Sequence, residues 1–236
     1  MQDDAGTGPS RRGSSVAAEA AAIGAAVAVF GATFGVLSVA AGLTPLQTQA
    51  TSLLVFTGAS QFAAVGIIDS GGTTAAAIGS ALLLAARNGM YGVSLSRRIR
   101  VSLPRRFVAA QLVIDETTAM ATAHPDETER AFWLTGLSVF VFWNLGTLVG
   151  ALGGGAIGDP ATLGLDAAFP AGFVALMAPH LRRRDARVAA AVGGAVAIVS
   201  VPFVPAGIPV LLAAVGVVPG YLVGRPLEAG SSEIDS

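Results

Sequence analysis

Hydrophobic positions in this chain gather into seven long runs separated by short polar segments. The runs cover residues 17–41, 46–68, 73–96, 131–153, 167–178, 188–204 and 208–224. A helix needs about 20 apolar residues to cross a bilayer core, and most runs meet or approach that length. A surface helix of a soluble domain would carry one polar face, whereas these runs are apolar nearly all round. The pattern predicts an all-α, polytopic membrane helix bundle with about seven spans.

Two arginine-rich loops flank a less apolar segment at residues 107–123. The loop at 96–106 holds five arginines and the loop at 181–187 holds four, and the positive-inside rule places both in the cytoplasm. That placement holds if 107–123 does not cross the membrane, so we favour a partly buried interfacial helix there. A re-entrant second run, broken near Gly58, would also satisfy the rule. The side of the N-terminus is left open.

Polar sequence at both ends sets the expected domain limits. We expect disordered tails at residues 1–18 and 226–236 and one transmembrane transport domain over 19–225. Inside it, Gly42-Leu43-Thr44 and Gly164-Leu165-Asp166 each follow a Gly-rich apolar helix. This echo is either an inverted repeat, as in many transporters, or a chance match in a sequence rich in Ala, Gly and Leu.

Composition narrows the chemistry further. Charged residues make up 12% of the chain, against roughly 25% in soluble proteins. The net charge of −1 favours no nucleic-acid partner. Cysteine is absent, and the two histidines, His124 and His180, stand at helix ends. We therefore expect no metal, no cofactor and no catalytic residues.

Arg87 and Asn88 stand well inside the third apolar run. A charge at membrane depth costs about 2.5–3.5 kcal/mol on insertion scales and needs a partner. The Arg87 guanidinium could bind a substrate carboxylate with two parallel hydrogen bonds. The alternatives are a structural ion pair with an acid, or a side chain that extends toward the cytoplasmic end of its helix.

Asp115 and Glu116 are the natural acidic counterparts of Arg87. Desolvation raises the pKa of a carboxylic acid, so these groups are candidates for carrying a proton in a proton-coupled transporter. The alternative is an interfacial helix with a hydrated acidic face.

Two further polar groups interrupt apolar runs. Thr57, Ser60 and Gln61 surround a glycine that could open the second run, and freed backbone groups beside them could bind a zwitterion. Asn144 and Thr147 are three residues apart in the fourth run. We take all five as candidate substrate-binding residues. The alternative for the first three is hydrogen bonding between helices, worth about 0.6 kcal/mol each. For the segment that holds Asn144 and Thr147 it is plain packing.

Several of these segments together resemble the AzlC family of branched-chain amino acid permeases. They are Gly42-Leu43-Thr44-Pro45, residues 52–62, Ala86-Arg87-Asn88-Gly89-Met90-Tyr91-Gly92, Asp115-Glu116-Thr117, Trp143-x-x-Gly146-Thr147, and Gly164-Leu165-Asp166 with Pro170-Ala171-x-Phe173. The family usually shows Asn-x-Arg-His at the third segment, where this chain has Ala85, Arg87 and Asn88. The resemblance covers roughly residues 20–224.

This resemblance implies a multi-pass inner-membrane subunit that exports leucine, isoleucine, valine and methionine with a small AzlD-like membrane partner. It implies energy from an ion gradient, and the sequence has no Gly-x-x-x-x-Gly-Lys-Ser/Thr nucleotide loop. Two alternatives are an intramembrane enzyme and a non-transporting scaffold. The enzyme is disfavoured because Gly58-Ala59-Ser60 is followed by Gln61 rather than glycine, and His-Glu-x-x-His is absent.

Overall fold

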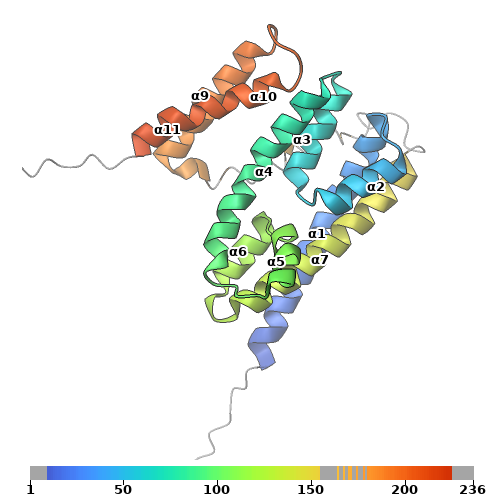
Figure 1. Cartoon of the computed structure of the whole chain (residues 1–236), viewed down its shortest axis with the longest axis vertical. Coiled ribbons are helices and arrows are strands. Elements are labelled where there is room, and N and C mark those ends of the chain that lie inside the picture. The colour runs from blue at the N-terminus through green and yellow to red at the C-terminus, as the bar shows by residue number, and fades with distance from the viewer. Residues whose placement is uncertain are drawn as a thin grey trace, which may run out of the picture. The chain divides into compact units, whose positions relative to one another are not determined.

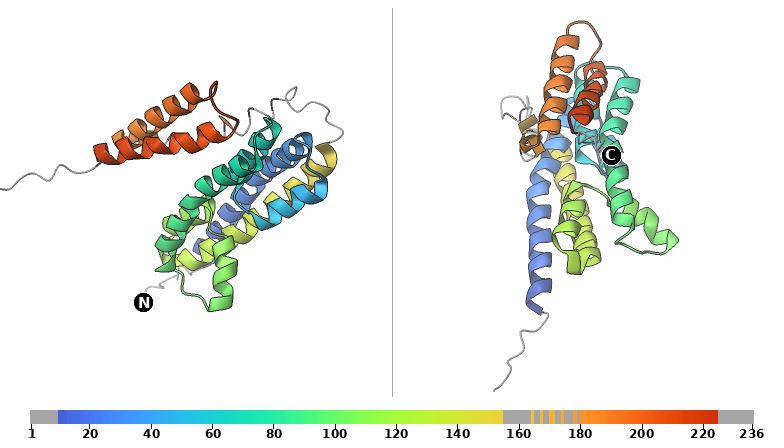
Figure 2. Two further views of the ribbon diagram at one scale, coloured as in Figure 1. Left: turned by 45° about the horizontal axis from the view of Figure 1, so that its top comes forward. Right: turned by 90° about the vertical axis from the view of Figure 1, so that its left-hand side faces the viewer.

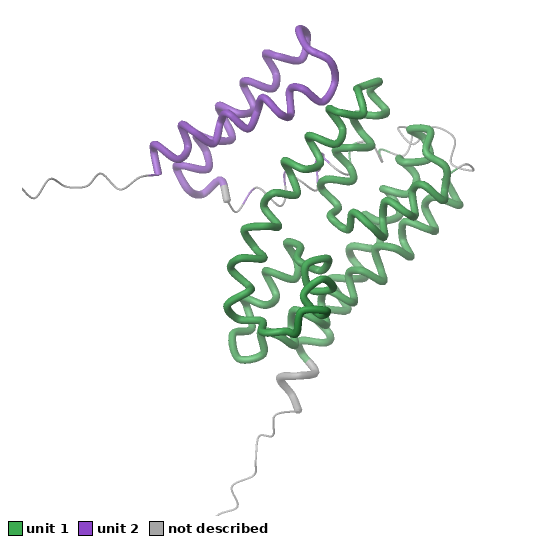
Figure 3. The backbone as a smooth tube through the Cα atoms, in the orientation of Figure 1, with its two compact units in different colours: residues 1–169 green, residues 170–236 purple. Residues whose placement is uncertain are grey.

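The computed structural model describes residues 10–154 and 180–224, with isolated positions between 164 and 178. Within these residues all regular secondary structure is helical, and there is no strand. It forms two compact units, residues 1–169 and 170–236 (Figure 3). The predicted run at 167–178 and second copy of the Gly-Leu echo lie mostly outside the described residues. The same holds for positions 1–9 and 226–236 of the predicted tails.

Unit 1 is built on two long helices that run side by side in the same direction, α1 (Ser10–Ala40) and α7 (Thr128–Gly153) (Figure 1). Glycines spaced four residues apart bring their backbones together. A Cβ at Gly146 would collide with the carbonyl oxygen of Ala28, and one at Gly150 with that of Ala32. Gly35 lies equally close to the α7 backbone. Such small-residue spacing is typical of helix pairs packed in membranes.

The parallel course of α1 and α7 bears on the predicted inverted repeat. Each helix precedes one copy of the Gly-Leu echo, and inversion would require the two helices to run in opposite directions. Gly24 of α1 lies against Ser138, and Gly35 lies against Thr147 and Ala151. Both helices therefore advance together, and inversion does not relate them.

Among the described residues, two segments are long and apolar enough to cross a membrane, Ser15–Ala40 and Pro125–Gly153. Helix α4 (Thr74–Ser96) has 23 residues, a length of about 34 Å, which also suffices, although Arg87 and Asn88 lower its hydropathy. The prediction of seven continuous spans is not confirmed.

The second predicted run, 46–68, differs most from the expected continuous span, because it forms two helices. Helix α2 (Pro45–Leu54) begins with a capping box between Thr44 and Gln47, and α3 (Gly58–Asp69) begins after the break. The Gln61 amide donates a 3.0 Å hydrogen bond to the Thr51 carbonyl. Ten residues would separate these groups by about 15 Å in a continuous helix, so the chain turns back at the break. This confirms the re-entrant alternative near Gly58 (Figure 1).

The predicted single helix over 107–123 is also two short helices, α5 (Leu103–Gln111) and α6 (Asp115–Ala123). The turn between them, 112–114, is buried. Thr117 Oγ1 donates to the Leu112 carbonyl and accepts the Ile114 amide, which fixes the start of α6. From this turn α6 returns along α7 to the short 3₁₀ helix η1 (Pro125–Glu127) that precedes α7. In Figure 2, α5 projects away from the other helices.

Unit 2 is an antiparallel pair. One arm is α9 (Arg184–Ser200), after the 3₁₀ turn η4 (His180–Arg182), and the other runs through α10 (Ile208–Ala213), η5 (Ala214–Gly216) and α11 (Val217–Gly224). Gly193 lies against Ala213, and Gly220 lies against Ala189 near the other end. These arms contain the sixth and seventh predicted runs.

Candidate functional site

The two pairs of short helices meet at their turns, near the middle of α7. The Phe56 ring, in the break between α2 and α3, lies 5.0 Å from that of Phe140. In the turn between α5 and α6, the Leu112 side chain packs against Gly136 of α7, where an added Cβ would lie 3.1 Å from it. Since α7 runs from residue 128 to 153, positions 136 and 140 stand near its midpoint. We call the region where the breaks meet, residues 53–58 and 111–116, the tip junction.

A glutamine at the end of α5 joins the two tips. The Gln111 side-chain amide donates to the carbonyls of Leu53 and Leu54 at 3.0 and 3.3 Å. These carbonyls belong to the last turn of α2, where no further helical N–H can reach them. The tip junction therefore joins backbone carbonyls of one re-entrant element to a side-chain amide of the other.

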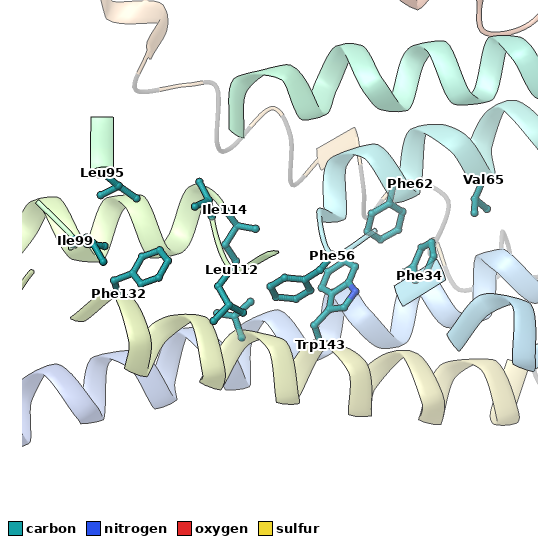
Figure 4. Close-up of a cluster of buried hydrophobic side chains, with 13 residues drawn as sticks. Phe34, Phe56, Phe62, Val65, Leu95, Ile99, Leu112, Ile114, Phe132 and Trp143 are labelled. Carbon is teal, nitrogen blue, oxygen red and sulfur yellow. The ribbon is translucent and has the colours of Figure 1, made fainter. Parts of the chain in front are cut away.

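Aromatic rings form the apolar side of the tip junction. Trp143 is 5% exposed and its ring lies 6.0 Å from Phe34 and 6.1 Å from Phe62 (Figure 4). Gly58 permits this approach, because a Cβ there would be 3.0 Å from Trp143 Cη2. The indole N–H is buried and has no hydrogen-bond partner. A buried donor beside an opened helix is a group that a polar ligand could satisfy.

The predicted residues on the second run occupy different surroundings. Ser60 donates to the Ala81 carbonyl of α4 at 2.8 Å, which ties α3 to α4. Gln61 is 1% exposed, and its amide nitrogen donates to the Thr51 carbonyl. Its Oε1 has no hydrogen-bond partner. Thr57 occupies the N-cap position of α3, and its side chain makes no capping bond. Gln61 and Thr57 are therefore at the break, whereas Ser60 serves packing.

Asn144 and Thr147 face α2. The Gln49 amide donates to Asn144 Oδ1 at 3.2 Å, and Ser52 donates to Thr147 Oγ1 at 3.1 Å. Helix α2 starts beside the end of α1, which lies against Thr147 and Ala151, and the Phe56 ring just after it lies against Phe140. It therefore runs antiparallel to α7. In this arrangement the two predicted residues hold the first half-helix in place.

Arg87 and Asp115 form an ion pair between α4 and α6, with 2.7 Å between Nη2 and Oδ2. Their side chains are 30% and 31% exposed. Arg87 Nε and Asn88 Oδ1 are buried without partners. Arg87 stands six residues beyond Ala81, about 9 Å further along α4 than the contact with Ser60. The structural ion pair weighed from the sequence is present, and the guanidinium keeps one donor free.

The structure brings together some predicted residues and adds others. Asp115 and Glu116 begin α6 at the tip junction, and Arg87 of α4 reaches Asp115. Sequence reasoning missed Gln111, although it is a lone polar residue in the apolar stretch 107–114. Among the described residues, no group of three or more His, Asp and Glu side chains could hold a metal ion.

Comparison with known proteins covers the same region. A sequence profile of the family described as AzlC protein matches residues 22–157. The inner membrane protein YgaZ of Escherichia coli (strain K12) is 31% identical over 178 residues, which cover 71% of this chain and 73% of the relative. An "Uncharacterized membrane protein" of Archaeoglobus fulgidus is 30% identical over 171 residues, covering 69% and 73%. No solved structure matches.

The fold and these relatives define a helical membrane protein of a transporter type rather than of an enzyme family. The chain belongs to the AzlC family. Every predicted site residue, from Thr57 to Thr147, falls inside the matched segment.

Proposed function

We propose that the chain is the large subunit of a secondary transporter that exports branched-chain amino acids across the cytoplasmic membrane. The observation that carries the proposal is the tip junction, where two re-entrant elements end near the middle of α7. Transporters place substrate at such interrupted helices, because the freed backbone groups bind charged ends of the solute near the bilayer midplane.

Aromatic rings beside the tip junction support a substrate with an apolar side chain. Phe56, Phe62 and Trp143 supply apolar surface beside the opened helix. A zwitterion with a branched aliphatic side chain would place its charged groups on the backbone and polar side chains, and its alkyl part on the rings. The family resemblance gives leucine, isoleucine and valine as the substrates of this shape.

The ion pair offers a route for energy coupling. Protonation of Asp115 would break its ion pair with Arg87, and protonation of the adjacent Glu116 would lower the negative charge beside it. Either change would free the guanidinium for a substrate carboxylate. Because neutralising one group releases the other, proton and substrate binding would be linked. We therefore keep Asp115 and Glu116 as the proton-coupling residues and Arg87 as a carboxylate ligand.

The course of unit 1 suggests an orientation. The start of α7 lies at the same end as the end of α4, because Ile99 and Phe132 pack in one cluster, and α1 is parallel to α7 (Figure 4). The start of α1 and the arginines at 97–106 therefore share one face. The positive-inside rule makes that face cytoplasmic, and a small AzlD-like membrane subunit would complete the transporter.

Efflux of a loaded dipeptide tests the function directly. Cells carrying the gene with its small-subunit neighbour are given a Leu-Val dipeptide, and intracellular valine is followed with and without a protonophore. We expect faster valine loss than in vector controls, slowed by the protonophore and by Glu116→Gln. Valine levels that do not change on deletion or on overexpression would contradict the proposal.

A further inference from the structure

The carboxyl end of α2 has an unusual set of hydrogen-bond partners. Three of its carbonyls accept bonds from side-chain amides of other segments. Gln61 binds the Thr51 carbonyl at 3.0 Å, and Gln111 binds those of Leu53 and Leu54. Carbonyls at a helix end carry partial negative charge and favour a cationic donor. Neutral amides fill these positions in the present structure.

The two amides are held very differently. Gln61 is almost fully buried within α3, so its position is fixed by packing. Gln111 ends α5, a nine-residue helix with no buried residue, and its bonds to α2 lie at an exposed position. Displacing the Gln111 amide would therefore disturb little buried surface. Only the two carbonyls it covers are readily available to another donor.

We propose that the carbonyls of Leu53 and Leu54 are the subsite for the ammonium group of the substrate, and that the Gln111 amide occupies it when substrate is absent. This inference rests on the proposed export of amino acids. A primary ammonium offers three N–H donors and a full positive charge, and charged hydrogen bonds are roughly twice as strong as neutral ones. Substrate thus displaces Gln111 and separates the α5 tip from the α2 tip.

The proposal makes Gln111 a competitor of the ammonium group alone. Gln111→Met keeps the length of the side chain and removes its donor. We expect leucine to bind this variant about two- to ten-fold more tightly than the wild type, the worth of one net hydrogen bond. Binding of 4-methylpentanoate, which is leucine without its ammonium group, should not change. Radiolabelled leucine and its displacement by unlabelled 4-methylpentanoate measure both on the purified full-length chain with its small subunit.

Two further variants separate this role from a structural one. Gln47→Met makes the same change at the other end of α2, where Gln47 only caps Thr44, and should alter neither affinity. Gln111→Asn keeps the amide but shortens the side chain by one methylene, so the amide no longer reaches the two carbonyls. It should also tighten leucine binding, and it replaces Gln111→Met if the Met variant folds poorly. Equal shifts for both ligands, or no shift for leucine, would overturn the subsite. Failure of the wild type to bind leucine at all would instead overturn the proposed function.

Discussion

The α1–α7 pair and the tip junction are contacts of opposite kinds within unit 1. Where α1 meets α7, backbone touches backbone through Gly31, Gly35, Gly146 and Gly150. At the tip junction, contact is made by side-chain amides, an ion pair and aromatic rings. The first contact has one close-packed geometry, whereas the second consists of bonds that a solute or a proton can replace.

This difference shows how a small membrane protein can combine a fixed frame with replaceable parts. Between α1 and α7, any added atom strikes a carbonyl, so the pair cannot slide without separating. Around the tip junction, on the helices that pack against it, Gln61 Oε1, Arg87 Nε and Trp143 Nε1 are buried with no partner. Unsatisfied buried groups are costly, and they are tolerated where a ligand or water completes them. Binding is therefore expected at the tips and not along the frame.

Breaking the frame should have the largest effect. In Gly150→Ala the new Cβ meets the Ala32 carbonyl, which cannot rotate away, so we expect destabilisation of about 3 kcal/mol and loss of most folded protein. Gly153→Ala is the matched control, because nothing lies within 4 Å of a Cβ there. Size-exclusion profiles and thermal melts of the detergent-solubilised variants measure the difference. Equal melting temperatures for the two would contradict the close-packed frame.

Breaking the ion pair should stop function while sparing the frame. For Arg87→Ala and Asp115→Ala we expect export to fall roughly ten- to hundred-fold, since bonds between charged groups contribute about 1.5–3 kcal/mol. Protein level and copurification of the small subunit should be kept. Export rates and subunit pull-downs on the same membranes measure both.

Two comparisons sharpen this prediction. Glu127→Gln removes the exposed pair with Arg130 and should change export little, because such surface pairs contribute at most about 1 kcal/mol. If Arg87→Ala instead releases the small subunit, Arg87 is structural and the scaffold alternative gains support.

Sequence reasoning reached the frame more readily than the junction. Apolar length identified α1, α4 and α7, because a helix that spans lipid must be long and apolar. The same rule merged α2 and α3 into one run, since a buried re-entrant break is as apolar as a span. Gly58 was the one sequence signal for that break. A glycine is compatible with a re-entrant segment, but it also occurs in continuous membrane helices.

The partners within the candidate site depend on contacts far apart in sequence. The opposite charges of Arg87 and Asp115 at membrane depth were enough to suggest their pairing. Nothing in the sequence indicates that Gln111 reaches Leu53, or that Asn144 binds Gln49, because these bonds join residues 58 and 95 positions apart. Such contacts follow from where the two turns meet along α7, which local patterns do not encode.

We expect the smallest effect on export from a change at Gly58, where the tip junction meets the α7 side of the frame. A Cβ there would lie 3.0 Å from Trp143 Cη2, so Gly58→Ala should push the indole aside and slow export a few-fold without unfolding the protein. Gly66→Ala, in open space on the same helix, should have no such effect. Trp143→Phe shortens the ring system, and the double variant should recover part of the rate lost by Gly58→Ala. Simple addition of the two losses would show that the glycine acts through the backbone of the break rather than through the indole.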